Sequence, residues 1–229
     1  MQTIWQHPNL PMQLQRVSVD DAGLPIAAAK AELEHYITTR SDGVSKTWGY
    51  FPETHPDESE YPQTTQLVAA FEHQVFQQTP LADLPLQLAF VRRATDEPVS
   101  KFGGFHVDAN AGISHSWPND VSLDKQVFRI LFNLDAVPRT LQFYPYTLDQ
   151  LRDRGIDIPR YHYEMLDNLP SSLEISSVDI PPREKNALYA LSFISTQVPH
   201  AGHTTANGHF LITYGAYIDQ AQIPQLFRK

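Results

Sequence analysis

The sequence of 229 residues contains no cysteine, which excludes a disulfide framework and a thiolate metal site. Histidine, aspartate and glutamate are therefore the only strong metal ligands that the chain offers. Basic residues are also few: 17 Lys and Arg stand against 26 Asp and Glu, a formal net charge of −9, and no basic block occurs. This balance argues against a nucleic-acid-binding protein and against binding to an anionic membrane.

Long hydrophobic runs are missing as well. No window approaches the roughly 18 uninterrupted apolar residues of a membrane span, and residues 1–10 lack the basic start and apolar run of a secretory signal. We therefore expect a cytoplasmic protein. The Gly-x-Ser-x-Gly elbow, the glycine-rich phosphate loop and the dinucleotide fingerprint are absent, so serine hydrolase, P-loop and Rossmann chemistry lack their required parts.

The chain contains a helical first third and a β-rich remainder. Apolar residues recur at intervals of three to four over 24–38 and 64–78, which predicts two packing helices. From residue 84 the pattern turns to β, and the predicted strands cover 86–91, 126–134, 140–144, 188–196 and 208–218. Helices followed by consecutive strands favour a mainly β fold with flanking helices, either an antiparallel barrel or a double-sheet jelly roll.

We expect one domain over residues 1–229, because all-β domains of this length are usually single. Within it we predict a helical support region at 1–82 and a β-barrel core at 83–145 and 186–218. Residues 146–185 are mixed in character and are interpreted as an insertion or lid.

A glycine-hinged segment, Phe102-Gly103-Gly104-Phe105-His106-Val107-Asp108, stands out in the β-rich part. In a strand, residues i and i+2 point to the same face, so His106 and Asp108 can present an imidazole and a carboxylate to one metal ion. The candidate third ligand is His200, with His203 as its local rival. Two histidines and one carboxylate form the facial triad that suits non-haem Fe(II), and the same set also makes a catalytic zinc site.

The order of these residues resembles that of the Fe(II)/2-oxoglutarate-dependent dioxygenases. His-x-Asp is followed by a long β-rich interval and then by Ser192 and His200-Ala201-Gly202, and the resemblance spans residues 86–218. It implies a double-stranded β-helix, which is a jelly-roll or cupin-like barrel. It also implies that His106, Asp108 and His200 hold Fe(II), that 2-oxoglutarate and O2 take the open positions, and that a C–H bond is oxidised, most simply by hydroxylation.

One position departs from the family pattern. In many of these dioxygenases a basic residue ten positions after the distal histidine binds the far carboxylate of 2-oxoglutarate, and here that residue is Phe210. Jumonji-type branches place this cation on an earlier strand, where this chain has Lys125 and Arg129. We prefer Arg129, because a guanidinium inside a strand can grip a carboxylate with two parallel hydrogen bonds. The alternative is that Arg129 pairs with an acidic neighbour or faces solvent.

Several other residues have open roles. Arg92 and Arg93 either contact an anionic substrate or form a solvated strand end, and His209 lies near the proposed site in sequence. Further candidates for hydrogen bonds to the cosubstrate are Asn133, Tyr144 and Tyr214. The loop aromatics are interpreted either as a substrate lid or as buried anchors, and they are Trp48, Tyr50, Phe51 and Trp117.

We expect a small-molecule substrate, similar to an amino acid or a natural product, and allow for a homodimer. Two other functions stay open: an oxygenase of a protein side chain, and a cupin-like barrel that binds a ligand without redox chemistry. A halogenase is disfavoured, because halogenating members of the family leave the carboxylate position vacant for chloride, and here Asp108 fills it.

Overall fold

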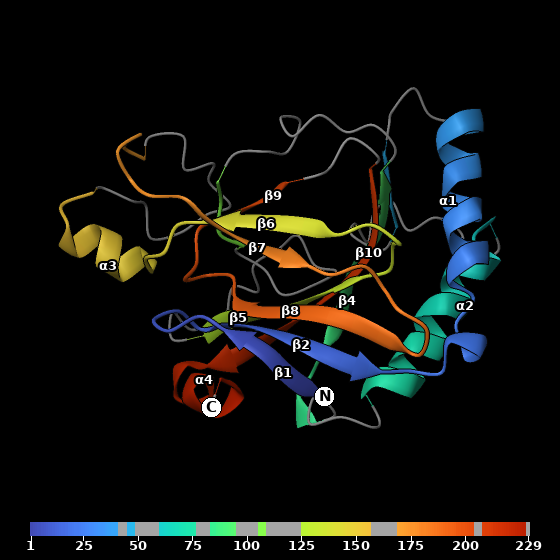
Figure 1. Cartoon of the computed structure of the whole chain (residues 1–229), viewed down its shortest axis with the longest axis horizontal. Coiled ribbons are helices and arrows are strands. Elements are labelled where there is room, and N and C mark those ends of the chain that lie inside the picture. Colours follow the sequence, from blue (N-terminus) through green and yellow to red (C-terminus); the bar gives the residue numbers. More distant parts are fainter. Residues whose placement is uncertain are drawn as a thin grey trace.

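Two antiparallel β-sheets face each other, and helices cover the outer face of the larger one (Figure 1). The structure is a computed structural model that describes residues 1–40, 45–48, 60–76, 83–94, 105–108, 125–156, 169–203 and 208–227. The larger sheet has seven strands in the order β1 (Gln2–Gln6), β2 (Met12–Ser18), β8 (Ala187–Ile194), β5 (Lys125–Asn133), β10 (His209–Asp219), β4 (Gln87–Ala94) and β3 (Ser45–Trp48). The smaller sheet has three in the order β7 (Ser176–Ile180), β6 (Arg139–Phe143) and β9 (His200–His203).

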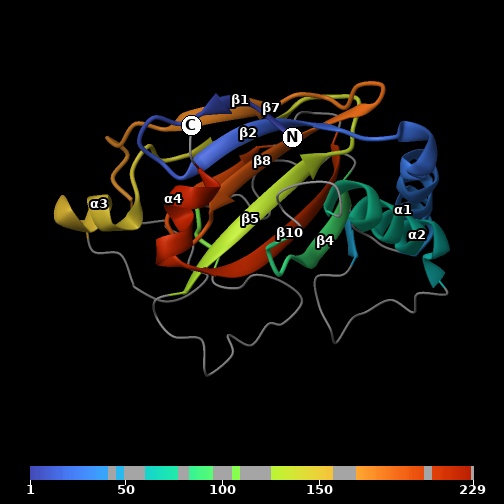
Figure 2. The same cartoon turned by 90° about the horizontal axis from the view of Figure 1, so that it is seen from below.

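The chain winds between the two sheets. It passes from β5 in the larger sheet to β6 and β7 in the smaller one, then to β8 in the larger, β9 in the smaller and β10 in the larger. Figure 2 shows β2, β8, β5, β10 and β4 side by side in the larger sheet. This winding defines a double-stranded β-helix, so the predicted fold class is confirmed, and the five predicted strands are confirmed with shifts of one or two residues at most ends.

The larger sheet separates two hydrophobic cores, because successive side chains of a strand point to opposite faces. In β5, Phe128, Ile130 and Phe132 pack with the helices on the outer face, whereas Leu131 packs between the sheets. In β10 the same alternation places Leu211 between the sheets. Burying each of these large side chains stabilises the fold by about 1.5–3 kcal/mol.

The two predicted helices pack on that outer face. The first is α1 (Ile26–Arg40), and the second is α2 (Pro62–Phe71), which continues as the wider turn η4 (Glu72–Phe76). Pro62 suits the first turn of α2, where its missing N–H is not needed. The Glu32 carboxylate of α1 accepts hydrogen bonds from the backbone N–H groups of Gln63 (3.0 Å) and Thr64 (2.8 Å). A residue of α1 therefore caps the positive end of α2.

Ion pairs join α1 to the larger sheet. Glu34 lies 2.6 Å from Arg93 of β4, and Lys30 lies 2.9 Å from Asp135, which follows β5. Arg93 and Asp135 are buried, so both pairs offset a charge that burial would otherwise make costly. Arg93 is therefore a buried anchor for α1, and the predicted solvated strand end is wrong for this residue.

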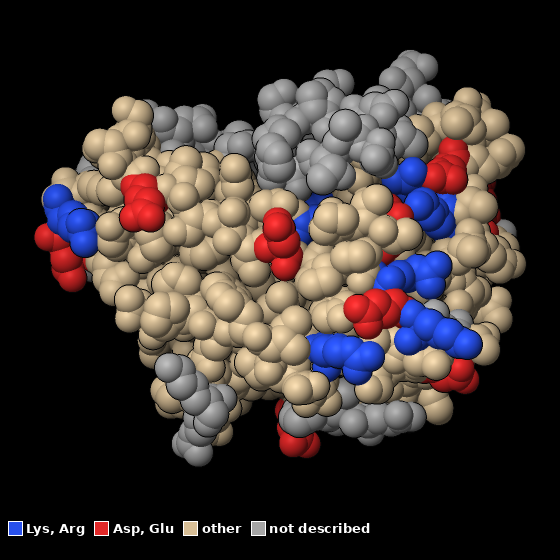
Figure 3. Space-filling view, viewed as in Figure 1, with Lys and Arg blue, Asp and Glu red and all other residues tan. Residues whose placement is uncertain are grey.

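Short helical elements complete the chain. They are η1 (Asp21–Gly23), α3 (Leu148–Asp153), η6 (Gln220–Gln222) and α4 (Ile223–Leu226). Thr147 and Gln150 form a reciprocal capping box at the start of α3. Over the described ranges, no helix is both long and apolar enough to cross a membrane. Basic and acidic side chains lie interspersed on the face drawn in Figure 3, mostly on the side of α1.

The predicted boundaries of the barrel core need correction. β2 lies in the range assigned to helical support, yet it pairs with β8 along its length, and β7 lies in the predicted insertion, yet it pairs with β6. Trp48, which was predicted to lie in a loop, is the last residue of the short strand β3 and is buried in the outer core as an anchor. β3 and β7 were not predicted because they have only four and five residues, too few for a clear alternation pattern. Tyr50, Phe51 and Trp117 lie outside the described residues.

Candidate metal centre

The residues around His106 extend the smaller sheet beside β9. The backbone N–H of His106 donates to the carbonyl of His200 (3.0 Å), and the N–H of His200 donates to the carbonyl of His106 (2.9 Å). The N–H of Asp108 then donates to the carbonyl of Ser195 (3.2 Å). Because directly opposed residues of an antiparallel pair share a face, this bridge brings the two histidine rings together. Their centroids lie 4.5 Å apart.

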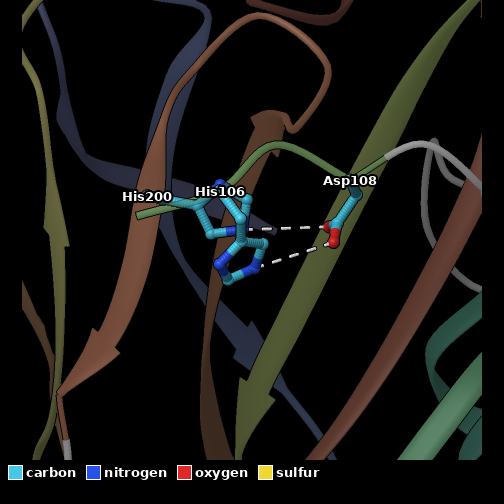
Figure 4. A group of neighbouring side chains, drawn as sticks. All are labelled: His106, Asp108 and His200. Carbon is cyan, nitrogen blue, oxygen red and sulfur yellow. Dashed lines mark ion pairs between the residues drawn. The ribbon is translucent and has the colours of Figure 1, made fainter. Parts of the chain in front are cut away.

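The predicted ligands meet at one point (Figure 4). Asp108 Oδ1 lies 3.9 Å from His106 Nε2, and Asp108 Oδ2 lies 3.8 Å from His200 Nε2. One potential ligand atom from each residue lies within 4.8 Å of the others. Donors bound to one ion at about 2.0–2.2 Å stand roughly 3.0–3.5 Å apart, so the three side chains must move closer together to share an ion.

His200 is oriented for ligation before any metal binds. Its Nδ1 lies 2.9 Å from the carbonyl of Val198, which fixes a proton on Nδ1 and leaves the Nε2 lone pair facing Asp108. The ring of Phe193 packs edge-on against it, with centroids 4.7 Å apart. Burial, followed by the neighbouring His106, lowers the pKa of His200 to about 4, so the ring is neutral near pH 7. Sequence reasoning missed the contributions of Val198 and Phe193.

Asp108 is held as a carboxylate. Burial alone raises its pKa, but the charge of Arg129, followed by those of the two histidines, outweighs burial and lowers the pKa to about 2. The carboxylate is therefore ionised at neutral pH, as metal ligation requires.

Arg129 contacts the carboxylate of Asp108, one of the three predicted ligands. It projects from β5, is only 2% exposed, and donates from Nε to Asp108 Oδ2 at 3.0 Å. Arg129 lies inside a strand, as predicted, on the face of β5 opposite Phe128, Ile130 and Phe132. The alternative in which it pairs with an acidic residue also holds, although the partner is Asp108, which the sequence did not suggest. Its predicted grip on 2-oxoglutarate stays a prediction.

Asn133 does not face an open ligand position. Its amide nitrogen donates to the carbonyls of Val137 (2.8 Å) and Pro181 (3.0 Å), and its oxygen accepts from the N–H of Asp135 (3.0 Å). These bonds join the end of β5 to the chain that follows β7. The prediction that Asn133 binds the cosubstrate is therefore wrong, because backbone groups occupy its hydrogen-bonding capacity.

Tyr214 lies on the opposite side of the larger sheet from the metal ligands. Its ring stacks on Phe71 of α2 at 5.9 Å in the outer core, and burial, followed by Glu72, raises the pKa of its hydroxyl well above the usual value. The predicted cosubstrate contact is therefore wrong. The reason is the alternation of β10, which gives Tyr214 the same face as Ile212.

Tyr144 lies beside the ligand segment. Its backbone N–H donates to the carbonyl of Pro199 (3.1 Å), and its ring lies 4.3 Å from that of Phe105. Burial raises the pKa of its hydroxyl. Its contact with the cosubstrate stays a prediction. Of the two candidate third ligands, His200 belongs to the cluster. The side chain of His203 lies outside the described residues, so the choice between the two stays a prediction.

The structure is a double-stranded β-helix, and His106, Asp108 and His200 form a two-histidine, one-carboxylate cluster that could hold a metal ion. No family model matches the chain, and no curated protein matches it. Solved structures resemble it at low sequence identity, and three are described here.

The Kdo hydroxylase KdoO, a non-haem Fe(II) alpha-ketoglutarate-dependent dioxygenase in complex with succinate and Fe(III), is 15% identical. The match covers 86% of this chain and 76% of KdoO, with a TM-score of 0.46. HygX from Streptomyces hygroscopicus, with nickel and 2-oxoglutarate bound, is 13% identical over 93% of this chain and 84% of HygX, with a TM-score of 0.46. The alpha-ketoglutarate-dependent epimerase SnoN from nogalamycin biosynthesis is 15% identical over 93% of this chain and 80% of SnoN, with a TM-score of 0.43.

Proposed function

We propose that this protein is a non-haem Fe(II) dioxygenase that depends on 2-oxoglutarate and oxidises an unactivated C–H bond of a small-molecule substrate. The observation that carries the proposal is the convergence of His106, Asp108 and His200 beside the space between the two sheets. Two histidines and one carboxylate leave three coordination positions of Fe(II) open. These suffice for a chelating 2-oxo acid and O2.

The bound iron, with 2-oxoglutarate and O2, would supply the redox chemistry, and the protein supplies orientation and charge. Val198 holds His200 in the tautomer whose Nε2 is free to bind. Arg129 bonds to Asp108 Oδ2, which leaves Oδ1, the oxygen nearer His106, available to the metal. The buried Arg129 also offsets the carboxylate charge in a region of low dielectric.

Around the ligands, the inner faces of the sheets provide an apolar wall. Phe193 and Leu131 come from the larger sheet and Phe143 from the smaller, and all three belong to the inner core. Such a wall limits access of water to the reacting groups. The acidic net charge of −9 favours a small molecule over a nucleic acid as partner. The cytoplasmic location and the homodimer stay expectations from the sequence.

An anaerobic titration of the purified protein tests the proposal. Fe(II) is added first and 2-oxoglutarate second, while the visible metal-to-ligand charge-transfer band is recorded. We expect one iron per chain and a band that appears only after 2-oxoglutarate. Iron binding without the band would contradict the cosubstrate assignment, and tight zinc binding with hydrolytic turnover would favour the zinc alternative.

The substrate class needs a second measurement. Succinate release is followed by mass spectrometry with a metabolite panel and with a peptide panel, both with iron and 2-oxoglutarate present. Gain of one oxygen atom in a metabolite is the expected result. Gain of oxygen in a peptide would favour a protein oxygenase, and the absence of succinate with every substrate would favour a ligand-binding barrel without redox chemistry.

A further inference from the structure

A second group of polar side chains faces the space between the sheets, away from the three metal ligands. In β10, Phe210 points to the outer core and Leu211 to the inner one, so His209 and Thr213 share the inward face with Leu211. In β4, Arg92 lies directly opposite Leu211 and therefore also faces inward. The larger sheet thus presents a guanidinium, an imidazole and a hydroxyl to the inner space.

The smaller sheet contributes Arg139 from the start of β6. Arg139 precedes Leu141 by two residues, and Leu141 belongs to the inner core, so both face the larger sheet. Its Nε and Nη1 atoms are buried. Its Nη2 lies so close to Gly202 that a Cβ on that glycine would stand 2.6 Å away. Because Gly202 has no side chain, the Arg139 guanidinium has space to pack against β9.

The side chain of His209 indicates that a ligand binds between the sheets beside these residues. The residue is 3% exposed, yet neither ring nitrogen has a hydrogen-bond partner among the described residues. The hydroxyl of Thr213, also buried, is likewise without a hydrogen bond in this part of the chain. Buried polar atoms in native proteins are nearly always bonded, so such a pair is expected where a ligand supplies the missing partner. Burial, followed by the charges of Arg139, Arg92 and Arg93, lowers the pKa of His209. Strand register sets His209 opposite Ala94, two residues from Arg92 in β4.

We propose that Arg139, Arg92, His209 and Thr213 bind the distal carboxylate of 2-oxoglutarate and replace the basic residue that is missing at Phe210. This inference rests on the proposed function. Gly202 follows His200 by two residues in β9, about 7 Å along the strand. A dicarboxylate that chelates the metal with its 2-oxo-acid end can therefore extend toward Arg139. Arg93 is excluded from the set, because it pairs with Glu34 on the helix side.

The assignment gives each residue a distinct role. Two guanidinium groups, one from each sheet, can each donate charge-assisted hydrogen bonds to the carboxylate. Such bonds are roughly twice as strong as hydrogen bonds between neutral groups. The hydroxyl of Thr213 and a protonated nitrogen of neutral His209 add donors. Selection for a second carboxylate follows, because a 2-oxo acid without one could not accept these hydrogen bonds.

The test compares two ligands rather than two activities. The full-length protein is loaded anaerobically with Fe(II), and the dissociation constants of 2-oxoglutarate and of 2-oxopentanoate, which lacks the distal carboxylate, are measured by calorimetry and by the charge-transfer band. We expect the wild type to prefer 2-oxoglutarate. In Arg139→Met this preference should fall by about tenfold to hundredfold, while 2-oxopentanoate binding changes little.

Two smaller substitutions test the same pocket in case Arg139→Met prevents folding. Thr213→Val and Gly202→Ala should each reduce the same preference, the second because its methyl group displaces the Arg139 guanidinium. Arg16→Met is the matched control: Arg16 pairs at 3.8 Å with Glu184 and should leave the preference unchanged. Iron stoichiometry and circular dichroism verify that each variant is folded.

The outcomes separate the two proposals. If the wild type binds iron but neither 2-oxo acid, the proposed cosubstrate is wrong. If the wild type prefers 2-oxoglutarate and the preference survives in Arg139→Met, Arg92→Met and Thr213→Val, the proposed function stands and this carboxylate pocket is wrong. A loss confined to Arg129→Met would then assign the carboxylate to Arg129.

Discussion

Arg129 Nε and Asp108 Oδ2 lie 3.0 Å apart, across the gap between β5 of the larger sheet and the segment beside β9 of the smaller one. The bond therefore joins the two sheets at the proposed metal centre. Arg129 is 2% exposed, so its charge depends on this carboxylate for compensation. A bound cation would add a second positive charge to the same carboxylate.

Removal of this guanidinium should destabilise the metal-free protein more than the metal-bound one. In Arg129→Met, a buried carboxylate loses its partner, and we expect the free energy of unfolding to fall by about 3 kcal/mol. A divalent cation restores the compensating charge, so Mn(II) should stabilise the variant more than it stabilises the wild type. Urea denaturation with and without Mn(II) measures both effects. Equal losses in the two conditions would contradict the proposed coupling.

Asp108→Asn keeps the shape of the side chain and removes the ligand charge. We expect Fe(II) affinity to fall by at least about 100-fold, since even the loss of a group that only orients a ligand costs 10–100-fold. Competition with a coloured chelator measures the affinity. Asp149→Asn is the control, because Asp149 is exposed on α3 and pairs with Arg152. Unchanged iron binding in Asp108→Asn would remove Asp108 from the ligand set.

Acid should destabilise the metal-free protein through His200. The unfolded ring has a pKa near 6.5, whereas burial in the folded protein lowers the pKa to about 4. Between these values the unfolded state binds more protons, so stability rises with pH over this window, by up to about 3 kcal/mol. Urea denaturation between pH 4 and 7 measures the slope.

The variant His200→Gln identifies the residue responsible for that slope. The lowered pKa of His209 acts in the same direction, so His200→Gln should flatten the slope without abolishing it. An unchanged slope in this variant would show that His200 does not carry the effect.

Loss of the carboxylate that caps α2 should weaken the helical layer and spare the metal centre. Glu32→Gln removes the charge from two hydrogen bonds to backbone N–H groups, and we expect a loss of about 1–2 kcal/mol in the free energy of unfolding. Fe(II) affinity should be unchanged, because Glu32 lies on α1. A large change in metal affinity would mean that α1 and α2 influence the site.

The strict alternation of β5 shows why part of the site could be predicted. The apolar face of Phe128, Ile130 and Phe132 left Arg129 on the other face, and the structure places it between the sheets. The spacing of His106 and Asp108 likewise predicted a shared direction. Strand β9 is only four residues long, so its sequence carries too little periodicity for a strand prediction.

The wrong predictions concern polar side chains that can either bind a ligand or bond and pack within the protein, because the sequence does not distinguish these two roles. Asn133 is a buried polar residue on the inner face, but backbone carbonyls rather than a ligand are its partners. Tyr214 shares the outer face with Phe210 and Ile212, a relation that alternation alone could have revealed. Arg139 was not singled out, because its neighbour Gly202 lies on a strand that the sequence did not predict.

The sequence by itself determined the five longer predicted strands, the two packing helices and the restriction of metal ligands to histidine and carboxylates, since these follow from local periodicity and from the absence of cysteine. Only the tertiary structure decided which distant groups meet. The pairing of the His106 segment with β9 assembles the ligands, and the facing of two sheets brings Arg129 to Asp108 and Arg139 near His209. Contacts between residues far apart in the chain depend on strand register and sheet packing, which no short stretch of sequence encodes.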